Sequence, residues 1–261
     1  MLLRCYVAHL KDEFGFAYDG IRHALIPIRR AARYAETLGV PNRIRNFRLK
    51  QPAPPEIPWV RLEVVLEFLA ELREKRPDLA GICALMGLAG LRELEAAFLR
   101  RCDYQPGSPY ALVTVTESGA HKPKNRASYR TVPICMQASL YLENWLKQAR
   151  PANGENMIFV PEGGTVWTGD ALSRRLSHYL RAFRLTIRPR DLRKSFSTHC
   201  ENVLRVPSDA LDMYLGQVGG RSALRARHYT ATIIETLARD IVQPLENSLS
   251  VLVIKNMESG N

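Results

Sequence analysis

Five short segments of the chain carry the side chains best suited to chemistry. In chain order they are GLRELE (90–95), HKPKNR (121–126), RPRDLRKSFSTH (188–199), LGQ (215–217) and RHYT (227–230). The guanidinium forks of Arg92 and Arg193 match the geometry of phosphate oxygens, and the hydroxyl of Tyr229 becomes a nucleophile once it loses its proton. Each residue also has an ordinary explanation. Arg92 would pair with Glu95, Arg193 would lie on a solvated basic face, and Tyr229 would pack in a core.

Charge points to a polyanionic partner. The 261 residues include 37 Lys plus Arg and 26 Asp plus Glu, which gives a formal net charge of +11. The sequence pI is about 9.7. A field of this sign attracts nucleic acid, although ribosomal and membrane-surface proteins have a similar charge.

The composition of 46% hydrophobic and 24% charged residues is ordinary for a globular protein, so a mainly disordered chain is excluded. The five cysteines are odd in number and scattered, which excludes a small disulfide scaffold and predicts reduced thiols without a metal site.

No run reaches the roughly 18 apolar residues that a membrane span needs. The stretch before Lys11 and Asp12 is too short for a signal peptide. The sequence therefore predicts a cytoplasmic protein that does not enter a membrane.

The first part of the chain is basic and ends in a proline-rich stretch. Apolar residues recur at three- and four-residue steps over 19–39, which predicts a helix, and residues 40–58 read as an interdomain linker. Residues 21–50 contain eight Lys or Arg residues and only one acidic residue, Glu36. This pattern favours a phosphate-gripping clamp over a merely solvated helix face. We expect a short helical domain over 1–55 and a larger one over 56–261.

The larger domain is predicted to be mainly α with a small antiparallel β-sheet (α+β). The β-rich runs 110–116 and 129–134, on either side of the basic loop, predict a hairpin, and a short strand is expected at 157–160. Apolar periodicity predicts helices over the following ranges: 62–72, 78–101, 168–183, 191–204, 208–215 and 222–240.

Taken in order, the segments resemble the tyrosine recombinase (phage integrase) family over roughly residues 60–232. The resemblance rests on a GLRxxE box, a lysine-rich hairpin ending in RTVP, a box of the form PxDLRxxFxTH, a Leu-Gly pair and a closing Tyr-Thr. It implies a tyrosine-recombinase catalytic domain preceded by a short helical core-binding domain.

The resemblance assigns a role to four of these residues. Tyr229 would attack a DNA phosphodiester and form a covalent 3′-phosphotyrosine, which conserves the bond energy for rejoining. Arg92 and Arg193 would grip the non-bridging oxygens of the scissile phosphate. Glu95 would orient Arg92 from behind.

A lysine of the hairpin would protonate the leaving 5′-oxygen as the general acid. Lys122 fits this role best by position, and Lys124 is a close alternative because the loop is long. Since the arginines and the lysine supply positive charge, the resemblance implies no metal and no cofactor.

Two positions depart from the pattern of the family. Arg190 stands where the family has a histidine, and Gln217 stands where it has a histidine or tryptophan after the Leu-Gly pair. Arginine does not act as a base, and glutamine donates a hydrogen bond without shuttling a proton. We count both as catalytic-site residues. Their identities also favour an alternative, a catalytically impaired DNA-binding protein with a regulatory or architectural role.

The resemblance implies double-stranded DNA as partner, in integration or other recombination of a mobile element, and a DNA-associated location. It further implies a tetramer on DNA that is a monomer when free, joined through the tail after Asp240. An RNA-binding protein is disfavoured because no RNA-recognition motif is present. Nicking and relaxation of supercoiled DNA, as by a type IB topoisomerase, would use the same chemistry.

Overall fold

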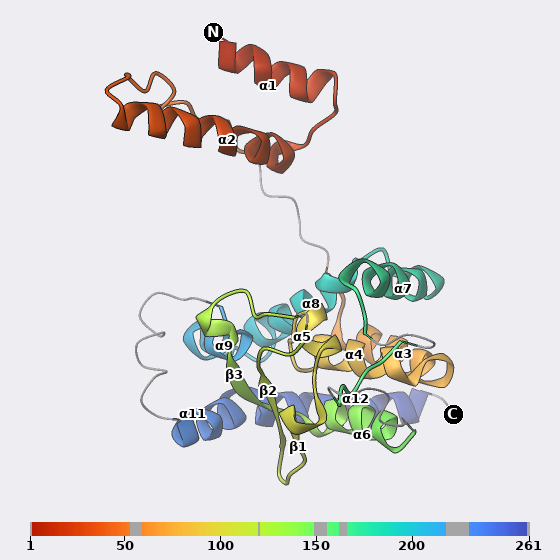
Figure 1. Cartoon of the computed structure of the whole chain (residues 1–261). Helices are drawn as coiled ribbons and strands as arrows, with labels where there is room; N and C mark the ends of the chain where they lie inside the picture. Colours follow the sequence, from red (N-terminus) through yellow and green to blue (C-terminus); the bar gives the residue numbers. More distant parts are fainter. Residues whose placement is uncertain are drawn as a thin grey trace. The chain divides into compact units, whose positions relative to one another are not determined.

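The computed structural model describes residues 2–52, 59–119, 121–148, 156–161, 166–217 and 230–259. The chain divides into two compact units, Met1–Glu56 and Ile57–Asn261. Each is described by itself (Figure 1). Within the described residues, no helix combines the length and the apolarity needed to cross a membrane.

The first unit is built from two helices, α1 (Leu2–Asp12) and α2 (Tyr18–Thr37). Its small core holds Leu10, Ile21 and Leu25. The periodicity predicted α2 within two residues at each end, whereas α1 was not predicted.

The second unit is organised around α4 (Pro77–Gly87), nearly every residue of which is buried. Three helices pack against it, namely α3 (Leu62–Lys75), α6 (Met136–Gln148) and α8 (Pro189–Asn202). A helix that is apolar on all sides must be covered on all sides, and these contacts do so.

The prediction of one helix over 78–101 is wrong. The chain leaves α4 after Gly87 and begins the short helix α5 (Glu93–Ala97) after a bend at Gly90, whose φ is +62°. A left-handed residue of this kind interrupts an α-helix and favours glycine. The bend turns the start of α5, and with it Arg92, toward α8 and α9.

A three-stranded antiparallel sheet lies beside these helices, with β1 (Tyr104–Gln105), β2 (Ala111–Val115) and β3 (Arg130–Ile134) in that order. The predicted hairpin is confirmed as β2 and β3, and β1 adds a short edge strand that was not predicted. The turns η1 (Arg101–Asp103) and η2 (Arg126–Ser128) flank the strands.

The strand expected over 157–160 is not formed. Met157 forms an isolated bridge to Arg100.

The remaining named elements in the described part of the second unit are helical. They are α7 (Gly169–Ala182), α9 (Ser208–Leu215), α11 (Thr230–Leu237), the π-helical turn η3 (Ala238–Val242) and α12 (Gln243–Ser259). Part of the helix expected over 222–240 lies outside the described residues. The tail packs on its own unit, since Leu245 and Leu249 are buried in the main core. The hydroxyl of Ser248 lies 3.3 Å from Nε2 of His199 in α8.

We predict that Gly90→Ala destabilises the second unit. A Cβ at this position would lie 2.7 Å from Leu215 Cδ2 and 2.7 Å from Phe196 Cδ1, in addition to the strain of a positive φ. The free energy of unfolding, measured in urea, should fall by about 3 kcal/mol. Gly169→Ala is the control, because its Cβ would be 3.8 Å from Leu94. Equal stability of the two variants would contradict the packing at the bend.

Candidate active site

The start of α5 brings Arg92 and Glu95 together. Arg92 is the residue before the first helical turn, and the Oε2 atom of Glu95 accepts its backbone N–H at 2.9 Å. This capping interaction fixes the carboxylate at the helix N-terminus, where negative charge is favoured. The Oε1 atom of Glu95 accepts a hydrogen bond from Nη1 of Arg92 at 2.5 Å. The side chain of Glu95 is 1% exposed and that of Arg92 is 31% exposed, so the carboxylate lies beneath the guanidinium.

Arg130 is the site residue that sequence reasoning missed. It begins β3, and its Nη2 and Nη1 atoms donate to the two carboxylate oxygens of Glu95 at 3.0 and 3.3 Å. Its Nε donates to the carbonyl of Tyr214 at 2.7 Å. The side chain is 7% exposed. A weak signal was available in the sequence, because an arginine two residues before the apolar run Val132–Ile134 needs an anion if it is buried, although the sequence does not say which one.

Arg193 comes from the first half of α8. Pro189 occupies the first turn of this helix, and Asp191 caps it by accepting the backbone N–H of Arg188 at 2.9 Å. Nη1 of Arg193 donates to the carbonyl of Gly90 at 2.7 Å and lies 3.7 Å from Glu95 Oε2. The bend after α4 therefore supplies one of the acceptors that orient Arg193.

The C-terminus of α9 anchors all three arginines through main-chain carbonyls. Gly216 ends the helix with φ +62°, Gln217 N–H donates to Asp212 O, and Gly216 N–H donates to Met213 O, which is a Schellman cap. The acceptors for the arginines are three successive carbonyls: Tyr214 O for Arg130 Nε, Leu215 O for Arg193 Nη2 and Gly216 O for Arg92 Nη2, at 2.7, 2.7 and 3.3 Å.

We call Arg92, Arg130 and Arg193 around Glu95 the arginine cluster. Burial alone raises the pKa of Glu95, but the charges and hydrogen bonds of Arg130 and Arg92 outweigh it and hold this pKa at about 2. Burial lowers the pKa of Arg193, and the charges of Arg92 and Arg130 lower it further, to about 9. Three cations against one carboxylate leave a net charge of +2. The cluster is therefore suited to bind an oxyanion.

Two other predicted residues lie beside Arg193. Arg190, Arg193 and Gln217 line one hollow of about 220 Å³, together with Lys194 and two carboxylate residues. The side chain of Arg190 is exposed, 4.0 Å from Asp191. No described residue that lines the hollow is a histidine, and Arg92 is not among the lining residues.

The two candidate lysines are exposed and lie in the connection from β2 to β3. Lys122 Nζ lies 3.9 Å from Glu117. Lys124 precedes Asn125, whose side chain accepts hydrogen bonds from the backbone and the hydroxyl of Ser128, each at 3.0 Å. Ser128 Oγ in turn accepts from Arg92 Nη1 at 3.3 Å. The segment after Lys124 is therefore tied to the arginine cluster.

Tyr229 lies outside the described residues, directly before α11. Two described tyrosines of the second unit are poor nucleophiles. The fully buried hydroxyl of Tyr214 donates to Pro133 O at 2.8 Å, and burial raises its pKa. Burial and the bond to Glu143 raise the pKa of Tyr104 to about 12.

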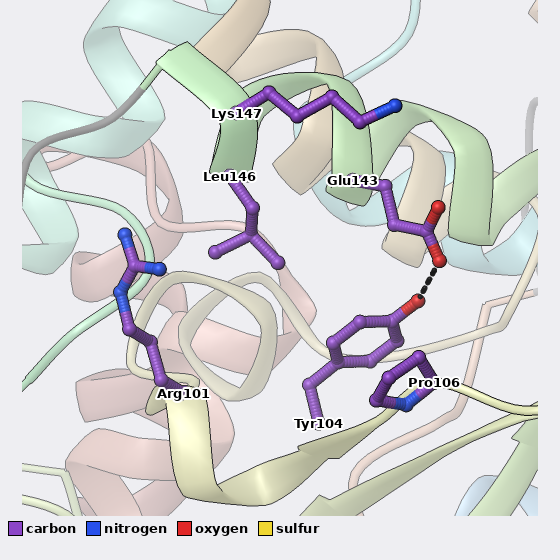
Figure 2. Close-up of a pocket in the computed structure, with 6 residues that line it drawn as sticks. All are labelled: Arg101, Tyr104, Pro106, Glu143, Leu146 and Lys147. Atoms are coloured by element: carbon purple, nitrogen blue, oxygen red, sulfur yellow. Dashed lines mark hydrogen bonds between the residues drawn. The ribbon is translucent and has the colours of Figure 1, made fainter.

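Another hollow, of about 500 Å³, lies between Tyr104 and α6 (Figure 2). The Tyr104 hydroxyl points to Glu143 across it and donates a hydrogen bond of 2.7 Å. Lys147 and Arg101 lie at its edge. None of the predicted site residues lines this hollow. Among the residues that the structure describes, no group of three or more His, Cys, Asp or Glu side chains could hold a metal ion.

Comparison with known proteins identifies the fold. No family model and no curated protein sequence matches the chain. Solved structures do match. The Tn1549 transposon integrase (residues 82–397), bound to circular intermediate DNA, aligns with a TM-score of 0.69 at 16% identity, over 88% of this chain and 81% of that one. The chain has the tyrosine-recombinase fold.

Two further recombinases show the same likeness. The XerH site-specific recombinase in a post-cleavage complex with palindromic difH aligns with a TM-score of 0.62 at 17% identity, over 90% of this chain and 71% of that one. A lambda integrase (75–356) dimer bound to a COC′ core site aligns with a TM-score of 0.59 at 13% identity, over 83% and 78%. The predicted fold class, mainly helical with a small antiparallel sheet, is confirmed.

We predict that Glu95→Gln removes a pH-dependent part of the stability. The pKa of Glu95 lies below its ordinary value of 4.5, at about 2, so ionised Glu95 stabilises the fold above about pH 4.5 and this contribution fades as the pH falls toward 2. The variant should be less stable by about 3 kcal/mol at pH 7, and the gap should narrow below pH 4.5. The measurement is urea unfolding from pH 7 to pH 3.

Glu71→Gln is the control, because Glu71 forms an exposed pair with Lys75. A gap for Glu95→Gln that stays constant with pH would contradict the ionised state of the cluster.

Proposed function

We propose that the protein is a site-specific DNA recombinase of the integrase type. It cleaves and rejoins double-stranded DNA through a covalent 3′-phosphotyrosine at Tyr229. The observation that carries this proposal is the arginine cluster, three arginines held around one carboxylate with a net charge of +2 on the tyrosine-recombinase fold.

The charge of the cluster suits the reaction. Tyr229 releases its proton to solvent, its oxygen attacks phosphorus, the bond from phosphorus to the 5′-oxygen breaks, and the leaving oxygen takes a proton from a lysine. The phosphodiester is a monoanion, and negative charge builds up on its non-bridging oxygens in the pentacoordinate transition state. Arg92 and Arg193, already oriented by Glu95 and by main-chain carbonyls, stabilise that charge without reorganising.

The first unit supplies the DNA clamp in this proposal. Four arginines line a polar hollow of about 420 Å³: Arg29, Arg33, Arg45 and Arg48. Among the charged residues that line it, Glu36 is the only carboxylate, and it pairs with Arg45 at 3.3 Å. An excess of guanidinium groups around a polar hollow suits the phosphates of a DNA backbone. The three integrase and recombinase structures described above are complexes with DNA, which supports the same partner.

Assembly on DNA is part of the proposal. We infer that the free protein is a monomer and that four copies assemble on DNA through the tail after Asp240. In the structure, this tail packs on its own unit through Leu245 and Leu249.

Arg190 and Gln217 favour a second candidate function, a catalytically impaired DNA-binding protein. They line the hollow beside Arg193, where the resemblance implies imidazole or indole side chains. The loss of a general acid or base costs about 10²–10⁴-fold in rate. This candidate predicts salt-sensitive DNA binding without a covalent product.

Covalent trapping distinguishes the two functions. The protein is mixed with supercoiled plasmid and with nicked suicide duplexes that carry the flanks of its own gene, and the mixture is quenched with SDS. We expect a protein–DNA adduct that is absent for Tyr229→Phe, because the phenyl ring has no nucleophilic oxygen.

Arg193→Lys tests the arginine cluster in the same assay. It keeps one positive charge and loses the guanidinium fork, so we expect at least a tenfold loss of adduct with DNA binding retained. Binding that collapses together with cleavage would make Arg193 a general anchor. Binding without adduct in the unaltered protein, on a duplex that holds its site, would favour the catalytically impaired protein.

The identity of the general acid gives a separate prediction. The contacts from Asn125 through Ser128 to Arg92 favour Lys124 over Lys122. Lys124→Ala should cleave an ordinary duplex about 10²–10⁴-fold more slowly. It should recover on a duplex whose scissile 5′-oxygen is replaced by sulfur, because a thiolate leaves without a proton.

Lys122→Ala serves as the matched variant and should cleave both duplexes almost normally. The reverse pattern would assign the role to Lys122. Loss in both variants without recovery on the sulfur duplex would mean that neither lysine is the general acid.

A further inference from the structure

We propose that Arg130 is a positioning residue of this site: it holds ionised Glu95 and the end of α9 in the arrangement in which Arg92 and Arg193 bind the phosphate. This inference rests on the proposed function and assigns a role to the arginine of the RTVP motif, to which the sequence analysis gave none. It makes the site a cluster of three arginines, one of which does not touch the substrate.

The contacts of Arg130 join three elements. From β3, its guanidinium donates to both oxygens of Glu95 in α5 and to the Tyr214 carbonyl at the end of α9. Nη1 also donates to the Ser128 carbonyl at 3.0 Å, next to the hydroxyl that accepts from Arg92. With its side chain 7% exposed, Arg130 is more buried than Arg92 or Arg193, so it acts from behind them.

Charge gives Arg130 a function that packing alone would not. Glu95 is almost fully buried, and burial of a carboxylate favours its neutral form. The charge and hydrogen bonds of Arg130 act against this effect more strongly than those of Arg92. Without Arg130, Glu95 would take up a proton more readily and would hold Arg92 less firmly.

Gly216 shows how closely the parts fit. A Cβ at this position would lie 2.8 Å from Nη1 of Arg130 and 2.9 Å from the Ala127 carbonyl. The glycine that ends α9 therefore serves two purposes. It allows the left-handed turn and leaves room for the Arg130 guanidinium.

Sulfate binding tests this role without DNA. Sulfate keeps its charge between about pH 5 and pH 8, so any change of its affinity with pH comes from the protein. The affinities of Arg130→Met and of the double variant Arg130→Met/Glu95→Gln are measured by calorimetry at constant ionic strength. With Arg130 replaced, the charged neighbours of Glu95 are Arg92 at the start of its own helix, Arg193 on α8 and His121 in the hairpin loop. The pKa of His121 is lowered, mainly by burial; Glu95 raises it and Arg92 lowers it. Burial raises the pKa of the nearby Glu93 to about 7, and His121 and Glu93 are present in both variants.

We expect Arg130→Met to bind sulfate about tenfold more weakly than the double variant at pH 8, and this ratio should shrink as the pH falls to 5. At pH 8, ionised Glu95 leaves the single variant one positive charge fewer. Toward pH 5, Glu95 without Arg130 takes up a proton more readily, which reduces that difference. A ratio that stays constant with pH would show a merely structural Arg130 and overturn the proposal.

Arg130→Lys keeps the proposal testable if the Met variants do not fold. Lysine keeps a charge beside Glu95 but cannot reach Glu95, Tyr214 and Ser128 together. Sulfate affinity should therefore fall about tenfold, and adding Glu95→Gln should change it little. Sulfate affinity equal to that of the unaltered protein would contradict the positioning role. Arg76→Met is the matched control, because it removes another two-bond arginine–carboxylate pair, with Asp78, and should leave sulfate affinity unchanged.

The outcomes separate this inference from the proposed function. Failure of covalent trapping, with the expected sulfate results, would count against recombination alone. A constant affinity ratio, with a normal DNA adduct, would count against Arg130 alone. No sulfate binding by the unaltered protein would contradict the arginine cluster as an anion site and both proposals with it.

Discussion

The arrangement of the site in the second unit depends on the buried carboxylate of Glu95. Three guanidiniums would repel one another in the interior, and this single negative charge, reinforced by the C-terminal carbonyls of α9, lets them share a small space. The cost of burying each charge is met only because nearly every polar atom of the group has a partner. Four elements from distant parts of the chain, α5, β3, α8 and α9, must therefore meet at one place (Figure 1).

Several irregular features of the fold follow from this meeting. The bend at Gly90 frees a carbonyl for Arg193 and turns the start of α5 inward. The Schellman cap at Gly216 exposes successive carbonyls on one side of the end of α9. Both glycines have positive φ and lie against packed side chains, so the backbone departs from regular structure where the arginines need acceptors.

The sequence predicted those parts of the molecule that depend on local pattern. Periodicity located α2, α8 and α9, and alternation located the hairpin of β2 and β3. The three-residue spacing of Arg92 and Glu95 predicted their pairing. The break after α4 was missed because residues 82–91 are all apolar or glycine and fit a continuous helix. Arg130 was missed because its partners lie 35 and 84 residues away, and no local pattern reports such contacts. The roles of Lys122, Lys124, Arg190, Gln217 and Tyr229 remain predictions.

Anchoring the arginines to the main chain has a consequence for how such a protein diverges. Every residue type offers a carbonyl oxygen, so these acceptors do not depend on the side chains at 214, 215 and 217, whatever else those side chains do. Only the glycine at 216 leaves a trace in the sequence, because the turn and the adjacent guanidinium both require it. Contacts made through main-chain carbonyls leave few fixed residue types for a sequence comparison to detect. The fold is accordingly recognisable in structures at 13–17% identity, where no family model and no curated sequence matches.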